Sequence, residues 1–196
     1  MTRIGIFSEN YDHDSCALRN ILEQTYDKTK YVFLPIIKTM EGDNLENVKK
    51  VRGLLEKDIQ KRRLDFVIIL RDLDSDPSDT EKIKKRTEWF KKVAIKQELD
   101  IFFLTIYQLE ALILADIQKF NELYDVKITL SNKPLFQQKP KEFLMQKTFK
   151  AKRKYQESHA PEIFEELHFD ELYNNHCHPD HPCFQSFIDE LTEKIS

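Results

Sequence analysis

Acidic side chains follow two of the apolar segments at the point where each segment ends. Asp72 and Asp74 come directly after the apolar run at 65–71, and Glu9 follows the run at 3–7. Carboxylate oxygens are the hard ligands that Mg²⁺ prefers, and Mg²⁺ bound by one or two carboxylates keeps positions open for substrate phosphate oxygens. A metal held in this way activates water or stabilises a leaving oxygen. The spacing therefore predicts a Mg²⁺ or Mn²⁺ site.

Asp76 and Asp79, in the sequence DPSD, favour a different interpretation. Asp and Ser are the residues that cap helix N-termini, so we expect these two acids to cap a helix rather than to bind metal. A calcium-binding EF-hand loop that starts at Asp72 is excluded, because Pro77 stands where the loop needs glycine and Ile83 where it needs a bidentate glutamate.

The elements that must position these acids follow from the apolar pattern. Four short and nearly continuous apolar runs are typical of parallel strands buried on both faces. They lie at 3–7, 31–37, 65–71 and 100–106. Helical spacing of apolar residues occurs at 14–25, 44–62, 80–97 and about 107–124, and three or four further helices are expected from about 140. This alternation predicts an α/β fold with a four-stranded, mainly parallel sheet and flanking helices.

The domain organisation expected from this pattern is one α/β domain at 1–125 with a helical C-terminal extension at 126–196 packed on it. In open parallel sheets, sites form at the carboxyl ends of the strands, so Glu9 and the Asp72–Asp74 pair should meet at one edge. Glu110 and Asp116 follow the fourth strand. Because they are six residues apart on a helix they point to different faces, and Glu110, nearer the strand end, is the better site candidate.

Composition excludes several function classes. The 196 residues include only three glycines, Gly5, Gly42 and Gly53, which form neither a phosphate-binding P-loop nor a dinucleotide-binding fingerprint. If the protein works with ATP, we therefore expect a partner to hydrolyse it. No apolar run reaches the roughly 18 residues of a membrane span, and three cysteines do not suggest a disulfide framework. We expect a cytoplasmic protein with no membrane partner.

Basic residues are unevenly distributed although the formal net charge is only −3. Lysines and arginines dominate 82–96 and 139–154, and acids dominate from Glu157 onward. Basic segments beside a metal site suit a nucleic-acid backbone, although a solvated helix face explains 82–96 equally well. Arg71, next to Asp72, could reach a phosphate or brace the carboxylates. The other residues expected to contact nucleic acid are Lys147, Lys150, Lys152, Arg153, Lys154 and His159.

A further cluster of metal-binding residue types lies at 175–183, in the sequence NHCHPDHPC. Its histidines and cysteines are plausible zinc ligands, from His176 to Cys183. The spacing is irregular, and the alternative is an ordinary turn before the last helix. The sequence leaves the two open.

The ordered set of motifs resembles the Toprim domain. A Glu after the first strand, in IGIFSEN, and a DxD after the third strand, in VIILRDLD, carry the resemblance. The chain is more similar to bacterial Toprim-like proteins related to the overcoming-lysogenisation-defect nucleases, which are often found in phage-defence loci. Further motifs of that group resemble QLEALILAD, KPKEFL (139–144), KYQESHAPEI (154–163) and CFQSFIDEL (183–191).

The resemblance implies a role for each acid. Glu9 would be a metal ligand or general acid/base, Asp72 and Asp74 the Mg²⁺-binding pair, and Glu110 the acid that completes the catalytic set. One departure is Asn10, which stands where the family usually has glycine after the first acid.

Three functions fit these observations. The first is a Mg²⁺-dependent Toprim-type nuclease that acts on DNA or RNA, as the effector of an anti-phage defence system with a separate ABC-type or AAA-type ATPase. The second is a non-catalytic Toprim-like subunit that regulates or binds within an ATPase complex. The third takes the DxD as a glycosyltransferase motif; the short chain, Glu9 and the basic segments count against it.

Overall fold

The sheet has four strands and all of them are parallel. The computed structural model describes residues 1–38 and 42–195, and its strands are β1 (Thr2–Phe7), β2 (Tyr31–Pro35), β3 (Phe66–Asp72) and β4 (Ile101–Thr105). They lie in the order β2-β1-β3-β4, with Ile4 paired to both Phe33 and Phe66. The prediction of a parallel α/β sheet from four apolar runs is confirmed.

Helices connect the strands, and further helices joined by loops follow β4. After β1 come a π-helical turn (Tyr11–Ser15) and α1 (Cys16–Thr25), and a 3-10 turn (Gly42–Glu46) precedes α2 (Val48–Arg62). The remaining helices are α3 (Thr80–Val93), α4 (Ala111–Ala115), α5 (Ile117–Tyr124), α6 (Pro140–Lys147), α7 (Ala160–Glu166), α8 (Phe169–Asn175) and α9 (Phe184–Ile195). Asp79 caps α3 by accepting a hydrogen bond from the Lys82 amide at 3.0 Å, as predicted.

The single helix expected over 107–124 is wrong, because the structure divides it into α4 and α5 at Asp116. Asp116 has the non-helical angles φ −119° and ψ 55° and caps α5 by accepting a hydrogen bond from the Lys119 amide. Its other oxygen accepts a hydrogen bond from the His168 backbone amide at 2.9 Å and lies 2.8 Å from His168 Nδ1. A buried carboxylate with these partners stabilises the break.

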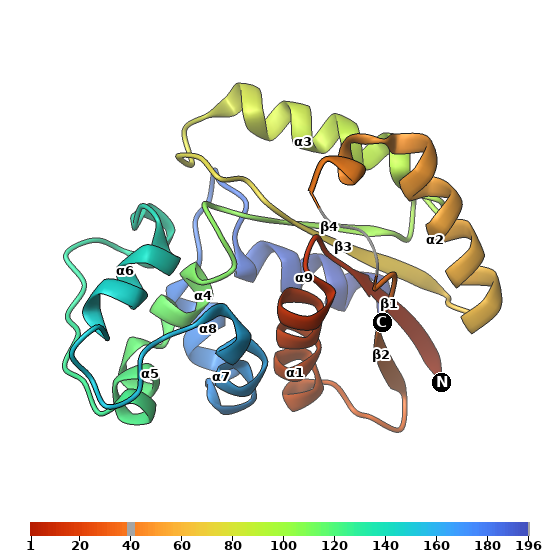
Figure 1. Ribbon diagram of the computed structural model, residues 1–196. Coiled ribbons are helices and arrows are strands. Elements are labelled where there is room, and N and C mark those ends of the chain that lie inside the picture. The colour runs from red at the N-terminus through yellow and green to blue at the C-terminus, as the bar shows by residue number, and fades with distance from the viewer. Residues whose placement is uncertain (39–41, 196) are drawn as a thin grey trace.

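The sheet has a separate hydrophobic core on each face. Alternating side chains of β3 divide between them: Ile68 and Leu70 pack with α1 and the C-terminal helices, whereas Val67 and Ile69 pack with α2 and α3. Figure 1 shows α2 and α3 on one side of the sheet and α1 on the other. The same alternation sends Asp72 toward the α1 face and Arg71 toward the α2–α3 face.

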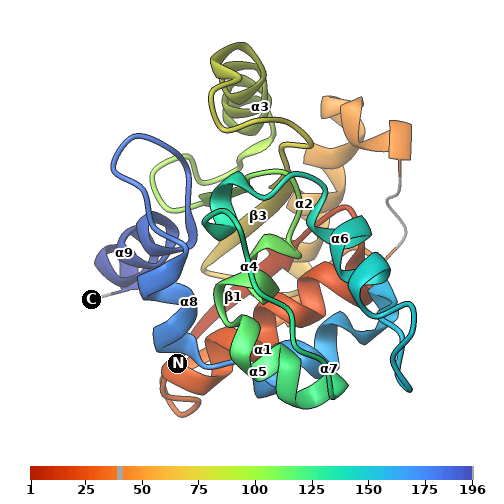
Figure 2. The ribbon, with the colours of Figure 1, turned by 90° about the vertical axis from the view of Figure 1, so that its left-hand side faces the viewer.

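The segment after residue 125 packs into the core on the α1 side. Residues of α6, α7, α8 and α9 share a hydrophobic cluster with β1 and α1. The side-chain amide of Asn20 in α1 donates to the carbonyl of Pro161 at 2.8 Å, and Figure 2 shows α7 lying beside α1. None of the helices within residues 1–38 and 42–195 has the length and apolarity needed to span a membrane.

Candidate functional site

A pocket of about 260 Å³ lies at the carboxyl ends of the strands. The four acids singled out from the sequence as catalytic, Glu9, Asp72, Asp74 and Glu110, all line it. The structure adds two more acids and one base: Asp14, Glu157 and Lys141. The pocket therefore gathers six carboxyl groups around a single lysine, with His13 at its wall.

Asp14 reaches the pocket because the chain makes a π-helical turn directly after β1. Asn10 caps this turn: its side-chain oxygen accepts from the His13 amide at 3.2 Å, and its side-chain nitrogen lies 2.8 Å from His13 Nδ1. The buried hydroxyls of Ser8 and Ser15 lie 2.7 Å apart and close the turn. Short π-helical segments are rare and are found frequently at functional sites. Here the segment directs Asp14 to the pocket that Glu9 also lines.

Asp72 and Asp74 are held by the end of β4. Thr105 Oγ1 donates a hydrogen bond to Asp72 Oδ1 at 2.5 Å, and the Asp74 amide donates to the Tyr107 carbonyl at 2.9 Å. Asp74 and Tyr107 have positive φ angles of 50° and 56°, a left-handed conformation that costs free energy for residues other than glycine. The adjacent ends of β3 and β4 are therefore both strained beside the pocket.

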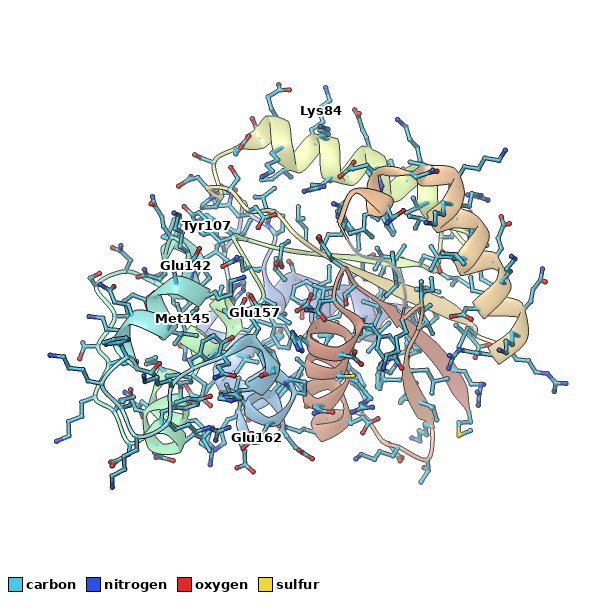
Figure 3. The ribbon with its side chains drawn as sticks, viewed as in Figure 1. Lys84, Tyr107, Glu142, Met145, Glu157 and Glu162 are labelled. Carbon is cyan, nitrogen blue, oxygen red and sulfur yellow. The ribbon has the colours of Figure 1, made fainter. Side chains whose placement is uncertain are left out.

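Glu110 and Glu157 reach the pocket from the C-terminal half of the chain. Glu110 precedes α4, and its Oε1 accepts a hydrogen bond from the buried Tyr155 hydroxyl at 3.0 Å. Glu157 lies between α6 and α1 in Figure 3 and forms an ion pair with Lys141. Glu157 also lies 4.0 Å from His13 Nδ1. Lys141 and Glu157 thus add an ion pair to the pocket lining from the C-terminal half of the chain.

The pKa values of the buried carboxyl groups are raised by burial and by repulsion between their negative charges. Burial, and then the charges of Glu110 and Glu9, raise the pKa of Asp14 to about 8. Burial, followed by the charges of Asp14, Glu110 and Asp74, raises the pKa of Asp72 well above its usual value, although the Thr105 hydrogen bond opposes this. Burial also raises the pKa of Glu110. Without a cation, these groups therefore retain protons that exposed carboxyl groups lose.

The donor chemistry of the pocket fits a hard divalent cation. The ligands are carboxylate oxygens, and a cation would remove the repulsion that raises their pKa values. The side chains are not already drawn together: among residues 1–38 and 42–195, no group of three His, Cys, Asp or Glu residues has the geometry of a metal site. Binding would therefore require the carboxylates to move toward the ion.

Arg71 does not line the pocket, although it is adjacent to Asp72 in the chain. Its side chain is 4% exposed and pairs with Glu46 on the α2–α3 face. The strand alternation that directs Asp72 into the pocket sends Arg71 to the other side of the sheet.

The remaining residues expected to bind nucleic acid also lie outside the pocket lining. Arg153 pairs with Glu162, which lies on the side of α7 away from Glu157 in Figure 3. His159 Nδ1 lies 2.7 Å from the Tyr124 hydroxyl, and burial lowers the pKa of His159. Lys147, Lys150, Lys152 and Lys154 are exposed, with Lys147 over the Phe143 ring and Lys154 over the Phe149 ring.

The segment 175–183 is engaged in packing. His176 is fully buried, its Nδ1 accepts from the Phe184 amide at 3.0 Å, and burial lowers its pKa to about 4. The rings of His178 and His181 stack with centroids 4.3 Å apart, and the Cys183 amide donates to the Ser186 hydroxyl. Neither this segment nor the rest of the described chain contains a preformed three-ligand metal group.

Sequence reasoning missed Asp14, Lys141, Tyr155 and Glu157. A signal for three of them was present, because Lys141 lies in KPKEFL and Tyr155 and Glu157 lie in KYQESHAPEI, two of the family-like stretches. Asp14 lies in FSENYDHD, four residues beyond the expected turn, and its position depends on the π-helical turn.

Comparisons of the chain with protein-family models, with curated proteins and with solved structures gave no match. The fold and the site therefore define the class in structural terms. It is an α/β protein whose parallel sheet carries an acidic pocket at its carboxyl edge.

Proposed function

We propose that the protein is a metal-dependent nuclease of the Toprim type that hydrolyses phosphodiester bonds of DNA or RNA. The observation that carries the proposal is the pocket, in which carboxyl groups from several elements line one cavity with Lys141, and burial, followed by their mutual repulsion, raises the pKa values of Asp14 and Asp72. Burying ionised carboxyl groups without a counter-charge destabilises the folded protein, and a bound divalent cation removes this destabilisation. The motifs that resemble Toprim-like proteins point to the same residues.

Each pocket residue has a role in this proposal. Glu9, Asp72 and Asp74 would hold Mg²⁺ or Mn²⁺, which supplies Lewis-acid stabilisation and an activated water when bound. Thr105 orients Asp72 through its hydrogen bond. Lys141, whose ammonium group is attracted by Glu157 and Glu110, brings positive charge to a site that must accept an anionic phosphate.

The proton-transfer groups come from the same pocket. Asp14, whose pKa is about 8 in the metal-free pocket, provides a carboxyl group for general acid or base catalysis. A bound cation lowers this pKa because it stabilises the carboxylate form. Glu110 is positioned by the Tyr155 hydroxyl and provides a second carboxyl group for the same purpose.

The proposed partner is a separate ABC-type or AAA-type ATPase of an anti-phage defence system, in which this chain is the effector. Support comes from the resemblance and from composition, since the three glycines form no phosphate-binding loop of the chain's own. A non-catalytic regulatory subunit is the second candidate. It is favoured by one observation, that the pocket acids of the described residues are not drawn into metal-binding geometry.

A cleavage assay on the purified protein separates these two functions. Plasmid, single-stranded DNA and tRNA are incubated with Mg²⁺, Mn²⁺ or EDTA, and wild type is compared with Asp72→Asn/Asp74→Asn. The control Asp125→Asn/Asp170→Asn makes the same chemical change at two acids outside the pocket lining. We expect metal-dependent cleavage that falls at least about a hundred-fold in the pocket variant, because loss of even an outer partner of a metal ligand costs 10–100-fold.

Two outcomes would contradict the nuclease. Cleavage that persists in EDTA or in the pocket variant would place the activity elsewhere. Absence of cleavage on all substrates with either metal, while the protein co-purifies with an ATPase, would favour the non-catalytic subunit.

A further inference from the structure

Two arginines share one carboxylate on the α2–α3 face of the sheet. Glu46 Oε1 accepts hydrogen bonds from Arg71 Nη2 at 3.1 Å and from Arg86 Nη1 at 3.0 Å. The Arg71 guanidinium carbon lies 4.4 Å from the centre of the Trp89 ring. The three charged groups come from separate elements: β3, the turn Gly42–Glu46 and α3.

The arginines have more donors than Glu46 can satisfy. Arg71 is 96% buried, and in the described part of the chain its Nε and Nη1 have no hydrogen-bond partner, nor has Nε of Arg86. Buried donors without partners are rare in folded proteins, and each destabilises the fold, more strongly when the group is charged. Two positive charges also face one negative charge. The cluster therefore has capacity for an anion with more acceptor oxygens than a carboxylate.

Glu46 is placed so that its carboxylate can leave without unfolding its segment. The Glu46 side chain is 56% exposed. The neighbouring Leu45 is buried, and its carbonyl accepts a hydrogen bond from Trp89 Nε1 at 2.9 Å, which fixes the backbone of the turn. Rotation of Glu46 into solvent would free the Arg71 and Arg86 donors that now contact its carboxylate and would keep this anchor.

The arginine cluster lies close to the acidic pocket. Arg71 and Asp72 are consecutive residues at the end of β3, and they point to opposite faces of the same strand. Glu9 lines the pocket, and its charge also acts on Arg71, so the arginine cluster and the pocket interact electrostatically. An anion at the arginines would thus lie across β3 from the pocket.

We propose that Arg71 and Arg86 form a phosphate-binding site and that the Glu46 carboxylate occupies it until a phosphate group replaces it. Arginine pairs suit phosphate because their planar donors match its oxygens. Resting on the proposed function, the phosphate belongs to a nucleic-acid strand and is a different phosphate from the one that is cleaved. Glu46 therefore competes with anions for the two arginines, and only an anion that binds the arginines more tightly than the carboxylate does can replace it.

The protein contains a reporter for this site, because Trp89 is its only tryptophan and stacks on Arg71. Fluorescence of Trp89 is followed while inorganic phosphate, or a short single-stranded oligonucleotide, is titrated in EDTA. We expect a saturable change. Saturation by the oligonucleotide at a concentration at least about ten-fold below that of inorganic phosphate assigns the site to a strand, whereas equal concentrations assign it to free phosphate ions.

Three variants test the exchange. Glu46→Gln removes the competing charge and is expected to lower the dissociation constant at least about five-fold. Arg86→Gln removes a direct contact and should raise it about ten-fold, the usual worth of a charged hydrogen bond. Lys84→Gln removes one positive charge from the same helix, α3, at an exposed side chain (Figure 3). It should change the dissociation constant less than about two-fold.

The inference is overturned if Glu46→Gln binds neither probe, or if Arg86→Gln and Lys84→Gln have equal effects. Because the titration contains no divalent metal and measures binding alone, its result is independent of the cleavage assay. Cleavage without the Trp89 response would leave the nuclease standing and remove the phosphate site. A Trp89 response without cleavage would support the phosphate site and contradict the nuclease.

Discussion

Replacing Asp14 by asparagine should make the metal-free protein more stable, by an amount that grows with pH. The pKa of Asp14 rises from 3.8 to about 8 on folding, mainly because the group is buried. Between these values the folded protein keeps a proton that the unfolded chain has released, so the stability of the wild type falls as pH rises. At about 1.36 kcal/mol per pH unit, the cost reaches roughly 4 kcal/mol at pH 7.

The asparagine side chain has the same shape as aspartate but cannot ionise, so the Asp14→Asn variant does not lose stability in this way as pH rises. Asp14 retains partial contact with solvent in the pocket, and screening lowers the expected gain to about 2–4 kcal/mol at pH 7. For a chain of this size that is a rise in melting temperature of roughly 6–12 °C. Chemical denaturation in EDTA at pH 5, 7 and 8 measures the difference in free energy of unfolding directly.

Asp12→Asn is the matched control, because Asp12 lies in the same turn but is exposed and pairs only at the surface with Lys38, at 3.2 Å. It should change stability by less than about 1 kcal/mol. Millimolar Mg²⁺ should narrow the gap between wild type and Asp14→Asn, since a bound cation compensates the same charge. A gap that does not vary between pH 5 and pH 8 would refute the reasoning, as would a variant less stable than wild type at pH 8.

Two further predictions concern buried polar groups outside the pocket. Burial lowers the pKa of His176 to about 4, so the unfolded chain takes up a proton first as pH falls below about 6.5; stability should then drop by about 3 kcal/mol by pH 4. Urea denaturation at pH 4.5 and 7 should show this drop in wild type and a smaller one in His176→Gln, and parallel curves would contradict it. Asp100 accepts hydrogen bonds from the backbone amides of Val67, Ile95 and Lys96 at 2.8–2.9 Å. Asp100→Ala should therefore cost at least about 3 kcal/mol in thermal or chemical unfolding, and Asp100→Asn, which keeps one acceptor, should cost less; equal losses would contradict this account.

The strand ends of the site could be predicted from the sequence, because their position depends on local patterns. Continuous apolar runs predict parallel strands, and parallel strands bring their carboxyl ends to one edge, which places Glu9 with the Asp72–Asp74 pair. Arg71 faces the opposite side of the sheet because side chains alternate along a strand. This alternation was readable in the sequence, and it contradicts the expectation that Arg71 braces the pocket carboxylates. The structure shows that neighbours on a buried strand cannot both face one pocket.

The rest of the site depends on packing between distant segments. Lys141 and Glu157 meet the pocket because α6 packs against α4 and α7 packs against α1, and no local pattern specifies those contacts. The position of Asp14 depends on the π-helical turn, which has one more residue per hydrogen-bonded turn than an α-helix and therefore changes the direction of the Asp14 side chain. The division of the helix at Asp116 likewise depends on a partner, His168, that is far along the chain.

The distance along the chain between Glu9 and Glu157 has a consequence for synthesis. Ribosomes deliver the N-terminal part first, so the strand ends with their acids can fold before Lys141 and Glu157 have emerged. A nascent protein would then carry carboxylates at an open edge without the lysine and the glutamate that complete the pocket lining. Lys141 and Glu157 therefore join the pocket only after α6 and the turn before α7 have been synthesised, so the complete site forms later than the strand ends that carry Glu9, Asp72 and Asp74.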